Sequence, residues 1–356
     1  MRSKGYDCIQ RPGLYLASRE YRLCGYGGSS LRNCMRSAWW PINGTGDAIQ
    51  SFEELLLAVK KLPTKRLAVA VAQDRDVLRA VDTAYRKGIA EATLVGNENE
   101  ILHIAETECL DLSPFKIINK ADKTEACRYA VDLVARGEAD LPMKGFVDTS
   151  VFLWAVLNKE DGLSDGKLIS HVGLFAVPGF ERLIIITDSA MNIAPEINEK
   201  ADIIRNAVAV AHALGNICPK VAVLCAVEKV NPKMQATLDA QILTRMNESG
   251  EINGCQVYGP LAMDNAVSLQ AALHKGIQNP VAGNADILLT PDIEAGNILN
   301  KAIEYFTPAE KAGVIMGTRV PVVLTSRASS DESKLNSIAL AVLVASKEKT
   351  EGAENG

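Results

Sequence analysis

Histidine is scarce in this sequence, with four among 356 residues, and aromatic side chains make up only 5% of the chain. Chemistry that depends on several histidines therefore has few residues to use, and we expect structural roles for all four. The eight cysteines include no C-x-x-C pair and do not cluster with histidine, so no metal site is expected. Scattered cysteines of this kind are typical of reduced, packed thiols, which predicts a cytoplasmic protein.

Long apolar runs are also missing. The longest candidate, Val221 to Val227, has the length of a buried strand and falls far short of the ~18 residues that a membrane span needs. The net charge of −5 gives no overall attraction for nucleic acid or an anionic membrane, so neither partner is expected. An anionic substrate would have to be bound by individually placed Arg and Lys side chains.

The first 48 residues differ from the rest, because they are rich in Tyr and Trp, carry more Arg than acids and follow no apolar period. A basic, acid-poor leader can be a targeting peptide, but the amphipathic period that such a peptide needs is absent. We interpret residues 1–48 as an N-terminal extension outside the fold.

From Ser51 onward, short apolar strands alternate with helices of 10 to 15 residues. The first helix begins with a capping box formed by Ser51 and Glu54. Strands are expected near 67–72, 92–95, 115–118, 172–177, 182–187, 221–227, 286–290 and 321–325. Helices are expected near 52–59, 75–87, 122–136, 149–158, 196–214, 233–248, 265–275, 294–305 and 333–346. Wholly apolar strands with helices between them predict an α/β fold with a mostly parallel sheet covered on both faces.

In such sheets ligands bind at the carboxyl ends of strands, and the end of the last expected strand carries the strongest signal. Ser326 and Arg327 follow that strand, and Ser330 precedes a helix. A guanidinium group that faces a helix N-terminus is suited to bind phosphate. Asp331 and Glu332 are interpreted either as catalytic acids or as ordinary first-turn acids of the helix.

Four further junctions place polar side chains after apolar strands or at helix starts, where they could contact a ligand or cap a helix. Their candidate binding residues are Lys144 and Thr149, Ser189 and Asn192, Asp264, and Thr290, Asp292, Glu294 and Asn297. Asp264 and Asp292 are also expected to cap the helices that follow them.

Taken together, these segments resemble the phosphate acetyl/butyryltransferase family, and the likeness runs from about Ser51 to the final helix. The resemblance is closer to the butyryl branch. It implies a two-domain, isopropylmalate-dehydrogenase-like architecture with the active-site cleft between the domains, usually in a homodimer. Domain 1 would comprise residues 49–174 and 313–356, and domain 2 would be inserted at 175–312.

The resemblance also implies a reaction, in which butanoyl-CoA and phosphate give butanoyl phosphate and CoA, without a metal or bound cofactor. The family's serine–arginine pair, which serves the CoA thiol and the phosphate, carries over to Ser326 and Arg327. The acetyl branch has a carboxylate base shortly downstream, but the aligned residue here is Ser333. Asp331 and Glu332 are therefore the nearest candidates for the base, and Lys144 and Thr149 are candidate phosphate contacts.

Three alternatives stay open. A phosphate acetyltransferase would differ only in the volume of its acyl pocket. An oxidoreductase of the related dehydrogenase fold would need a metal-binding set of acids, and none stands out. A CoA-binding protein without turnover would be consistent with the missing acid at position 333.

Overall fold

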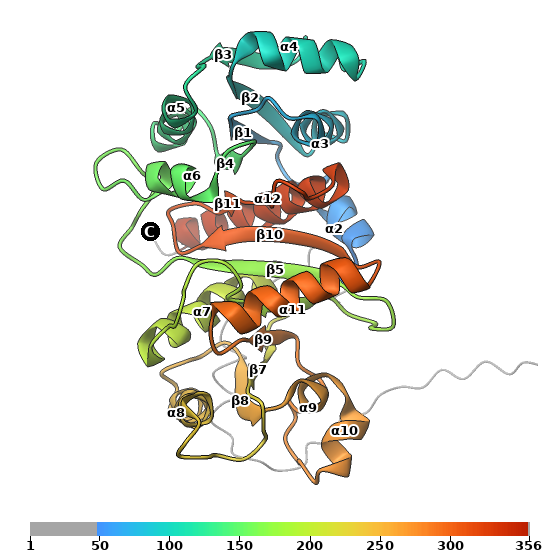
Figure 1. Ribbon diagram of the computed structural model, residues 1–356, viewed down its shortest axis with the longest axis vertical. Coiled ribbons are helices and arrows are strands. Elements are labelled where there is room, and N and C mark those ends of the chain that lie inside the picture. The colour runs from blue at the N-terminus through green and yellow to red at the C-terminus, as the bar shows by residue number, and fades with distance from the viewer. Residues whose placement is uncertain (1–47, 355–356) are drawn as a thin grey trace, which may run out of the picture.

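The computed structural model describes residues 48–354, which form one continuous sheet with helices on both faces (Figure 1). The predicted N-terminal extension lies, apart from Ala48, outside the described residues. Among the described residues the sheet has 11 strands in the order β3-β2-β1-β4-β11-β10-β5-β6-β9-β7-β8. The strands stack along the long axis of the molecule, so the first and last strands of this order lie at opposite ends (Figure 1).

The first half of the sheet is built from the N-terminal part of the chain. Its elements are α2 (Phe52–Val59), β1 (Lys65–Ala70), α3 (Arg75–Arg86), β2 (Ala90–Gly96), α4 (Glu98–Thr107), β3 (Lys116–Asn119), α5 (Lys123–Ala135), β4 (Leu141–Lys144) and α6 (Thr149–Val156). Strands β1 to β4 are parallel, as expected for apolar strands joined by helices.

The rest of the chain forms the second half and then returns to the first. Its elements are β5 (Ser170–Ala176), β6 (Ile184–Thr187), α7 (Ile197–Ala213), β7 (Lys220–Leu224), α8 (Gln235–Glu248), β8 (Gln256–Leu261), α9 (Met263–Val267), α10 (Leu269–His274), β9 (Ile287–Leu289), α11 (Ile293–Phe306), β10 (Glu310–Met316), β11 (Val322–Val323) and α12 (Asp331–Glu354). The last strand, β11, pairs in parallel with β4 of the first half.

Several helix starts were predictable because a side-chain oxygen there accepts a hydrogen bond from a free backbone N–H. Ser51 accepts from the N–H of Glu54 at 3.1 Å, and Asp292 accepts from the N–H of Ala295 at 2.8 Å. The capping box is only partly as predicted, because the Glu54 carboxylate binds the N–H of Gln50 and not that of Ser51.

The sequence prediction missed some elements, and two of its helix expectations were wrong. Helix α4 and strands β4, β8 and β10 are present but were not predicted. The helix expected over 265–275 is two short helices, α9 and α10, because Ser268 takes an extended conformation and caps the second one. Asp264 does not cap a helix; Ala262 stands at that position, and Asp264 lies inside α9.

The centre of the sheet is antiparallel. Strand β10 pairs over its whole length with β5, and it also pairs antiparallel with β11, while β5 pairs antiparallel with β6. The proposed domain boundaries, at 174/175 and 312/313, fall inside β5 and β10. The rest of the sheet is parallel, so the α/β class with a mostly parallel sheet is as predicted.

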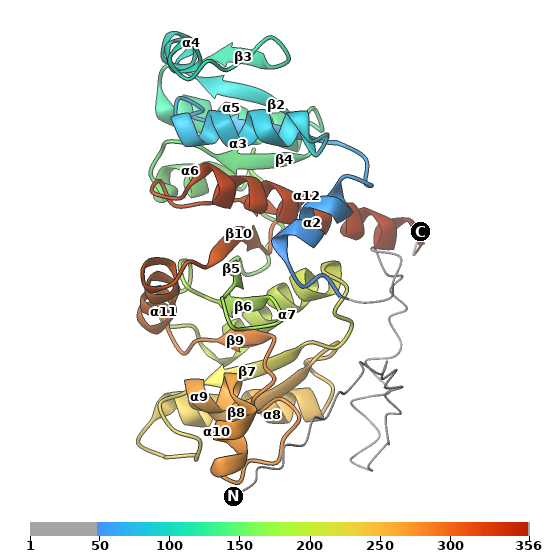
Figure 2. The same ribbon diagram turned by 90° about the vertical axis from the view of Figure 1, so that its right-hand side faces the viewer.

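The two faces of the sheet are packed differently. On one face, helices α2, α3, α4, α7, α8 and α12 share a single apolar cluster that runs along both halves. On the other face there are two separate clusters. One lies under α5 and α6, and the other lies under α9, α10 and α11. Figure 2 shows α11 on the side of the sheet opposite α7. No helix within residues 48–354 is long and apolar enough to cross a membrane.

Candidate active site

A small cavity, partly open to solvent, lies on the second face, between its two apolar clusters. Leu324 of one cluster and Phe175 of the other both line it. The remaining lining residues come from β5, α11, β10, the loop after β11 and the first turns of α12: His171, Gly173, Asn300, Lys301, Glu304, Lys311, Ala312, Gly313, Thr325, Ser326, Ser329, Ser333 and Ser337. The cavity is therefore bounded by both halves of the molecule.

The floor of the cavity is formed by two glycines that face each other across the central strands. Gly313 on β10 is the register partner of Gly173 on β5. A Cβ atom on Gly313 would lie 2.9 Å from Nε2 of His171 and 3.1 Å from the carbonyl oxygen of Leu324. Such contacts are too short for ordinary packing, so a glycine at position 313 lets the His171 ring and the Leu324 carbonyl lie close to the β10 backbone.

Ser326 and Arg327 lie in the turn that follows β11, as predicted, but they face different surroundings. Ser326 lines the cavity, whereas Arg327 does not. Arg327 instead pairs with Asp148 at 3.0 Å, and the two side chains are 56% and 63% exposed. An exposed pair of this kind contributes little to stability, so the guanidinium is available to an anionic ligand.

The first turn of α12 shows which side chains face the cavity. Ser330 caps the helix, because its Oγ accepts from the N–H of Ser333 at 3.2 Å. Ser333, where the acetyl branch has its acid, lines the cavity, but Asp331 and Glu332 do not. Glu332 instead lies near Glu310. Burial and this second carboxylate raise the pKa of Glu310.

Three cations gather where β4 and β11 end. Lys144 is only 2% exposed, and its ammonium donates to the carbonyls of Val147 at 3.1 Å and Gly145 at 3.3 Å. Burial, together with the positive charges of Arg327 and Lys334, lowers the pKa of Lys144 to about 8. A bound anion would relieve this repulsion, so the cluster favours a phosphate group.

Lys334, the third cation, and two further residues, Thr149 and Gly145, lie in the same region. Lys334 is buried at the start of α12 and donates to the carbonyl of Ser329. Its pKa is lowered by burial, although nearby acids including Asp74 and Asp331 oppose the shift. Thr149 is half-buried and begins α6. Gly145 is required there because a Cβ atom would lie 2.2 Å from the carbonyl oxygen of Val71.

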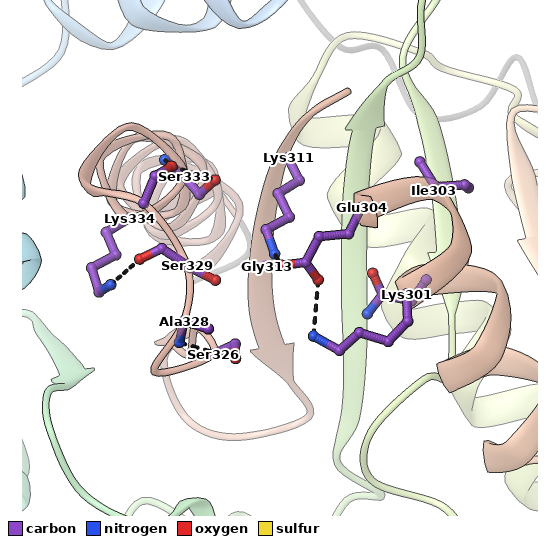
Figure 3. Close-up of polar contacts among 12 residues, drawn as sticks. Lys301, Ile303, Glu304, Lys311, Gly313, Ser326, Ala328, Ser329, Ser333 and Lys334 are labelled. Atoms are coloured by element: carbon purple, nitrogen blue, oxygen red, sulfur yellow. Dashed lines mark hydrogen bonds and ion pairs between the residues drawn. The ribbon is translucent and has the colours of Figure 1, made fainter. Parts of the chain in front are cut away.

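A second charged group lines the opposite wall of the cavity and was not predicted from the sequence. Glu304 on α11 pairs with Lys301 at 2.9 Å and with Lys311 on β10 (Figure 3). Burial would raise the pKa of Glu304, but the two lysines outweigh it, and the pKa is lowered. Figure 3 shows Ser326, Ser329 and Ser333 on the other side of the view.

The ends of β6 and β9 meet in one buried hydrogen-bond network. The hydroxyl of Thr290 donates to the carbonyl of Asp188 at 2.9 Å, and Asn297 Nδ2 donates to the carbonyl of Ser189 at 3.2 Å. The Asp188 carboxylate accepts from Asn192 Nδ2 at 2.6 Å. Two junctions that looked independent in the sequence are thus one unit.

This unit reaches the cavity through Ser189. Its hydroxyl lies 3.0 Å from Nδ1 of His171 and accepts from Asn300 Nδ2 at 3.4 Å. His171 and Asn300 line the cavity, whereas Ser189, Asn192, Thr290 and Asn297 do not. The predicted polar residues therefore support the lining residues from behind.

Three predicted binding residues lie away from the cavity. Asp264 pairs with Lys275 at 3.5 Å, Asp292 caps α11, and Glu294 is exposed on that helix. Sequence reasoning missed His171, Lys301, Glu304, Lys311 and Lys334. The available signal was a His or Lys inside an otherwise apolar strand or helix face, where burial of a charge needs a reason. Among the described residues, no group of three or more His, Cys, Asp or Glu could hold a metal ion.

Similarity to solved structures indicates the class. A branched-chain phosphotransacylase from Enterococcus faecalis V583 superposes with a TM-score of 0.70 at 33% identity, covering 79% of this chain and 99% of that chain. A phosphotransacetylase from Streptococcus pyogenes also gives 0.70, at 20% identity, covering 83% of this chain and 99% of that one, and indicates the fold alone. The fold and the cavity therefore define a two-domain α/β protein of the phosphotransacylase class.

Sequence comparison defines the family. The model described as phosphate acetyl/butaryl transferase matches residues 51–132 and 123–342. Phosphate butyryltransferase from Clostridium acetobutylicum is 52% identical over 297 residues, covering 83% of this chain and 99% of the relative. Phosphate acetyltransferase from Thermotoga maritima is 46% identical over 294 residues, covering 83% and 100%. The chain belongs to the phosphate acetyl/butaryl transferase family, which confirms the resemblance seen in the sequence.

Proposed function

We propose that this protein transfers a butanoyl group reversibly between CoA and inorganic phosphate. The observation that carries the proposal is the placement of Ser326 on the wall of a cavity beside the buried Lys144, Lys334 and the exposed Arg327. It is supported by the relatives named phosphate butyryltransferase, among them the one from Clostridium beijerinckii at 51% identity over 300 residues.

The residues suit this reaction because phosphate must be held against a thioester carbonyl. Arg327 grips phosphate with two N–H groups and reduces its charge. Lys144 adds a fixed positive charge, and Thr149, at the start of α6, adds a hydroxyl. Ser326 donates a hydrogen bond to the sulfur or the carbonyl in the cavity. Holding the two reactants in this geometry supplies much of the catalysis in transfers of this kind.

The proton balance determines what base the reaction needs. A hydrogen phosphate oxygen attacks the carbonyl carbon, the C–S bond breaks, and the phosphate proton ends on the thiol. In the reverse direction a base toward the thiol is required, and Ser333 cannot supply one. Asp331 and Glu332 are the nearest acids in sequence, and we propose that they act through solvent, since neither lines the cavity.

The remaining predicted residues have supporting or outer roles in this proposal. Ser189, Asn192, Thr290 and Asn297 fix the ends of β6 and β9 behind the cavity. We propose that Asp292 and Glu294, at the start of α11, and Asp264 contact the long CoA chain and not the reacting atoms.

A second candidate is phosphate acetyl transfer. It is favoured by the Thermotoga maritima relative, which is named phosphate acetyltransferase and is 46% identical. Acetyl and butanoyl differ by two methylenes, and one methylene is worth about 1–3 kcal/mol in a hydrophobic pocket, so both substrates would turn over at different rates.

We further propose a cytoplasmic homodimer that has CoA and phosphate as substrates and needs no metal or bound cofactor. Its first domain would consist of residues 49–174 and 313–356, with the second domain inserted at 175–312. The boundaries would then cross β5 and β10, where the cavity has its floor.

The test is phosphate-dependent release of free thiol from butanoyl-CoA and acetyl-CoA by the intact protein. The proposal expects butanoyl-CoA to react faster and neither substrate to react without phosphate. Faster release from acetyl-CoA would favour the second candidate. No release from either substrate would overturn the enzyme function and favour a CoA-binding protein.

A further inference from the structure

His171 is the one histidine in the cavity lining, and it was not among the site residues predicted from the sequence. It lies on β5, is 8% exposed, and stands beside the paired glycines of the floor. A Cβ atom on Gly313 would meet its Nε2 at 2.9 Å, which places that ring nitrogen beside Gly313, another residue of the cavity lining. No hydrogen-bond partner for Nε2 is found in the described part of the chain, so this atom is free to meet a ligand.

The other ring nitrogen is fixed by a buried chain of hydrogen bonds. Nδ1 lies 3.0 Å from the hydroxyl of Ser189, which is 1% exposed. That hydroxyl already accepts from Asn300 Nδ2, so its own hydrogen needs an acceptor. Nδ1 of His171 is the acceptor in reach. This pairing favours the tautomer that carries its proton on Nε2.

Burial favours the neutral form of the ring. Burial lowers the pKa of His171, Asp188 at the end of β6 acts to raise it, and Lys311 on β10 lowers it further. Glu304 on α11 lines the same cavity as His171, but its carboxylate is paired with Lys301 and Lys311. A neutral imidazole that accepts a hydrogen bond at Nδ1 is a donor, and not a base, at Nε2.

We propose that the Nε2–H group of His171 is a catalytic hydrogen-bond donor that stabilises the oxyanion formed on the acyl carbonyl. This inference rests on the proposed function. As the phosphate oxygen bonds to the carbonyl carbon, the C=O electron pair moves onto oxygen, where Nε2–H meets it. The pair returns as the C–S bond breaks, and the phosphate proton passes to the thiolate. His171 keeps its own proton throughout, as a preorganised donor does.

Two variants and a control test the role. His171→Leu removes the donor, and His171→Gln retains an N–H group near the position of Nε2. The control is His103→Gln, on the exposed face of α4. We expect His171→Leu to lose about 10²–10³-fold in kcat with KM for butanoyl-CoA little changed, as when one oxyanion donor is removed. His171→Gln should recover most of that loss, and His103→Gln should match the unaltered chain.

A second measurement does not depend on turnover or on the folding of any variant. Nitrogen NMR of the unaltered chain, with ¹⁵N in its histidine rings, distinguishes the protonated from the unprotonated ring nitrogen. The proposal expects the proton on Nε2 of His171 at pH 7. A proton on Nδ1, or a folded His171→Leu variant with kcat within about threefold of the unaltered chain, a change too small for a lost oxyanion donor, would overturn this inference alone. Absence of phosphate-dependent thiol release by the unaltered chain would overturn it together with the proposed function.

Discussion

Gly173 and Gly313 are register partners on two antiparallel strands, β5 and β10, in the middle of the sheet. Both line the cavity where the two halves of the molecule meet, between the apolar clusters under α6 and α11, and a methyl group on Gly313 would press against His171 and the Leu324 carbonyl. The strands that join the two halves therefore also provide the floor of the candidate active site.

The glycine pair gives the first prediction. Gly313→Ala places a methyl group 2.9 Å from Nε2 of His171 and close to a backbone carbonyl that cannot move easily. We expect kcat for butanoyl-CoA to fall by about tenfold or more, because a small displacement of reacting groups is costly. Gly173→Ala is the matched comparison, since its methyl meets a ring edge of Phe175 at 3.0 Å. Equal effects of the two changes would contradict the special role of position 313.

The second prediction concerns Arg327. Its exposed pair with Asp148 contributes little to folding, so Arg327→Ala should leave the melting temperature nearly unchanged. The same change should lower kcat/KM for phosphate by about 100-fold or more, and Arg327→Lys should recover only part of it, because a lysine cannot bind phosphate with two parallel hydrogen bonds. Asp148→Asn serves as the control. If it lowers activity as much as Arg327→Ala, the ion pair and not the free guanidinium is what matters.

The third prediction is a pH dependence. Lys144 has a pKa lowered to about 8, so it is charged below that pH and neutral above it. Phosphate KM should therefore rise as the pH increases through about 8. The assay is run from butanoyl-CoA, so that the thiol, which ionises near 8.5, is only a product. Lys144→Met should raise KM at pH 7 and remove its rise above pH 8. A rise that persists in this variant would assign the effect to another group.

The fourth prediction concerns the stability of the cavity wall formed by Glu304 and Lys311. Glu304→Gln leaves the half-buried Lys311 without its carboxylate partner. We expect the free energy of unfolding to drop by about 1–3 kcal/mol, the cost of an unsatisfied buried group. Glu294→Gln, exposed on the same helix, should change it by less than about 0.5 kcal/mol. Denaturant melts of the two variants measure the difference, and equal midpoints would show that Lys311 finds another partner.

Local signals account for much of what the sequence predicted. Apolar strands bounded by polar turns identified most of the parallel strands, and Ser51, Asp292 and Ser330 marked helix starts because a side-chain oxygen there binds a free N–H. The final Ser326-Arg327 turn was found for the same reason, since it directly follows an apolar strand. These features depend on neighbours in the chain, so the sequence alone is sufficient.

The tertiary structure decided what depends on distant segments. Strand β10 carries Lys311 and a glycine among its apolar residues. Its pairing with β5 and β11 makes it a strand, and the pairing with β5 brings Gly313 to Gly173. His171 looked like a core histidine, and Ser189 in the loop after β6 and Asn300 of α11 fix its ring toward the cavity. Which acids face the cavity was likewise set by packing, because the apolar side of α12 is buried and turns Ser333, and not Glu332, toward the site. Composition and period determined the α/β class, whereas long-range pairing and burial determined where its chemistry can take place.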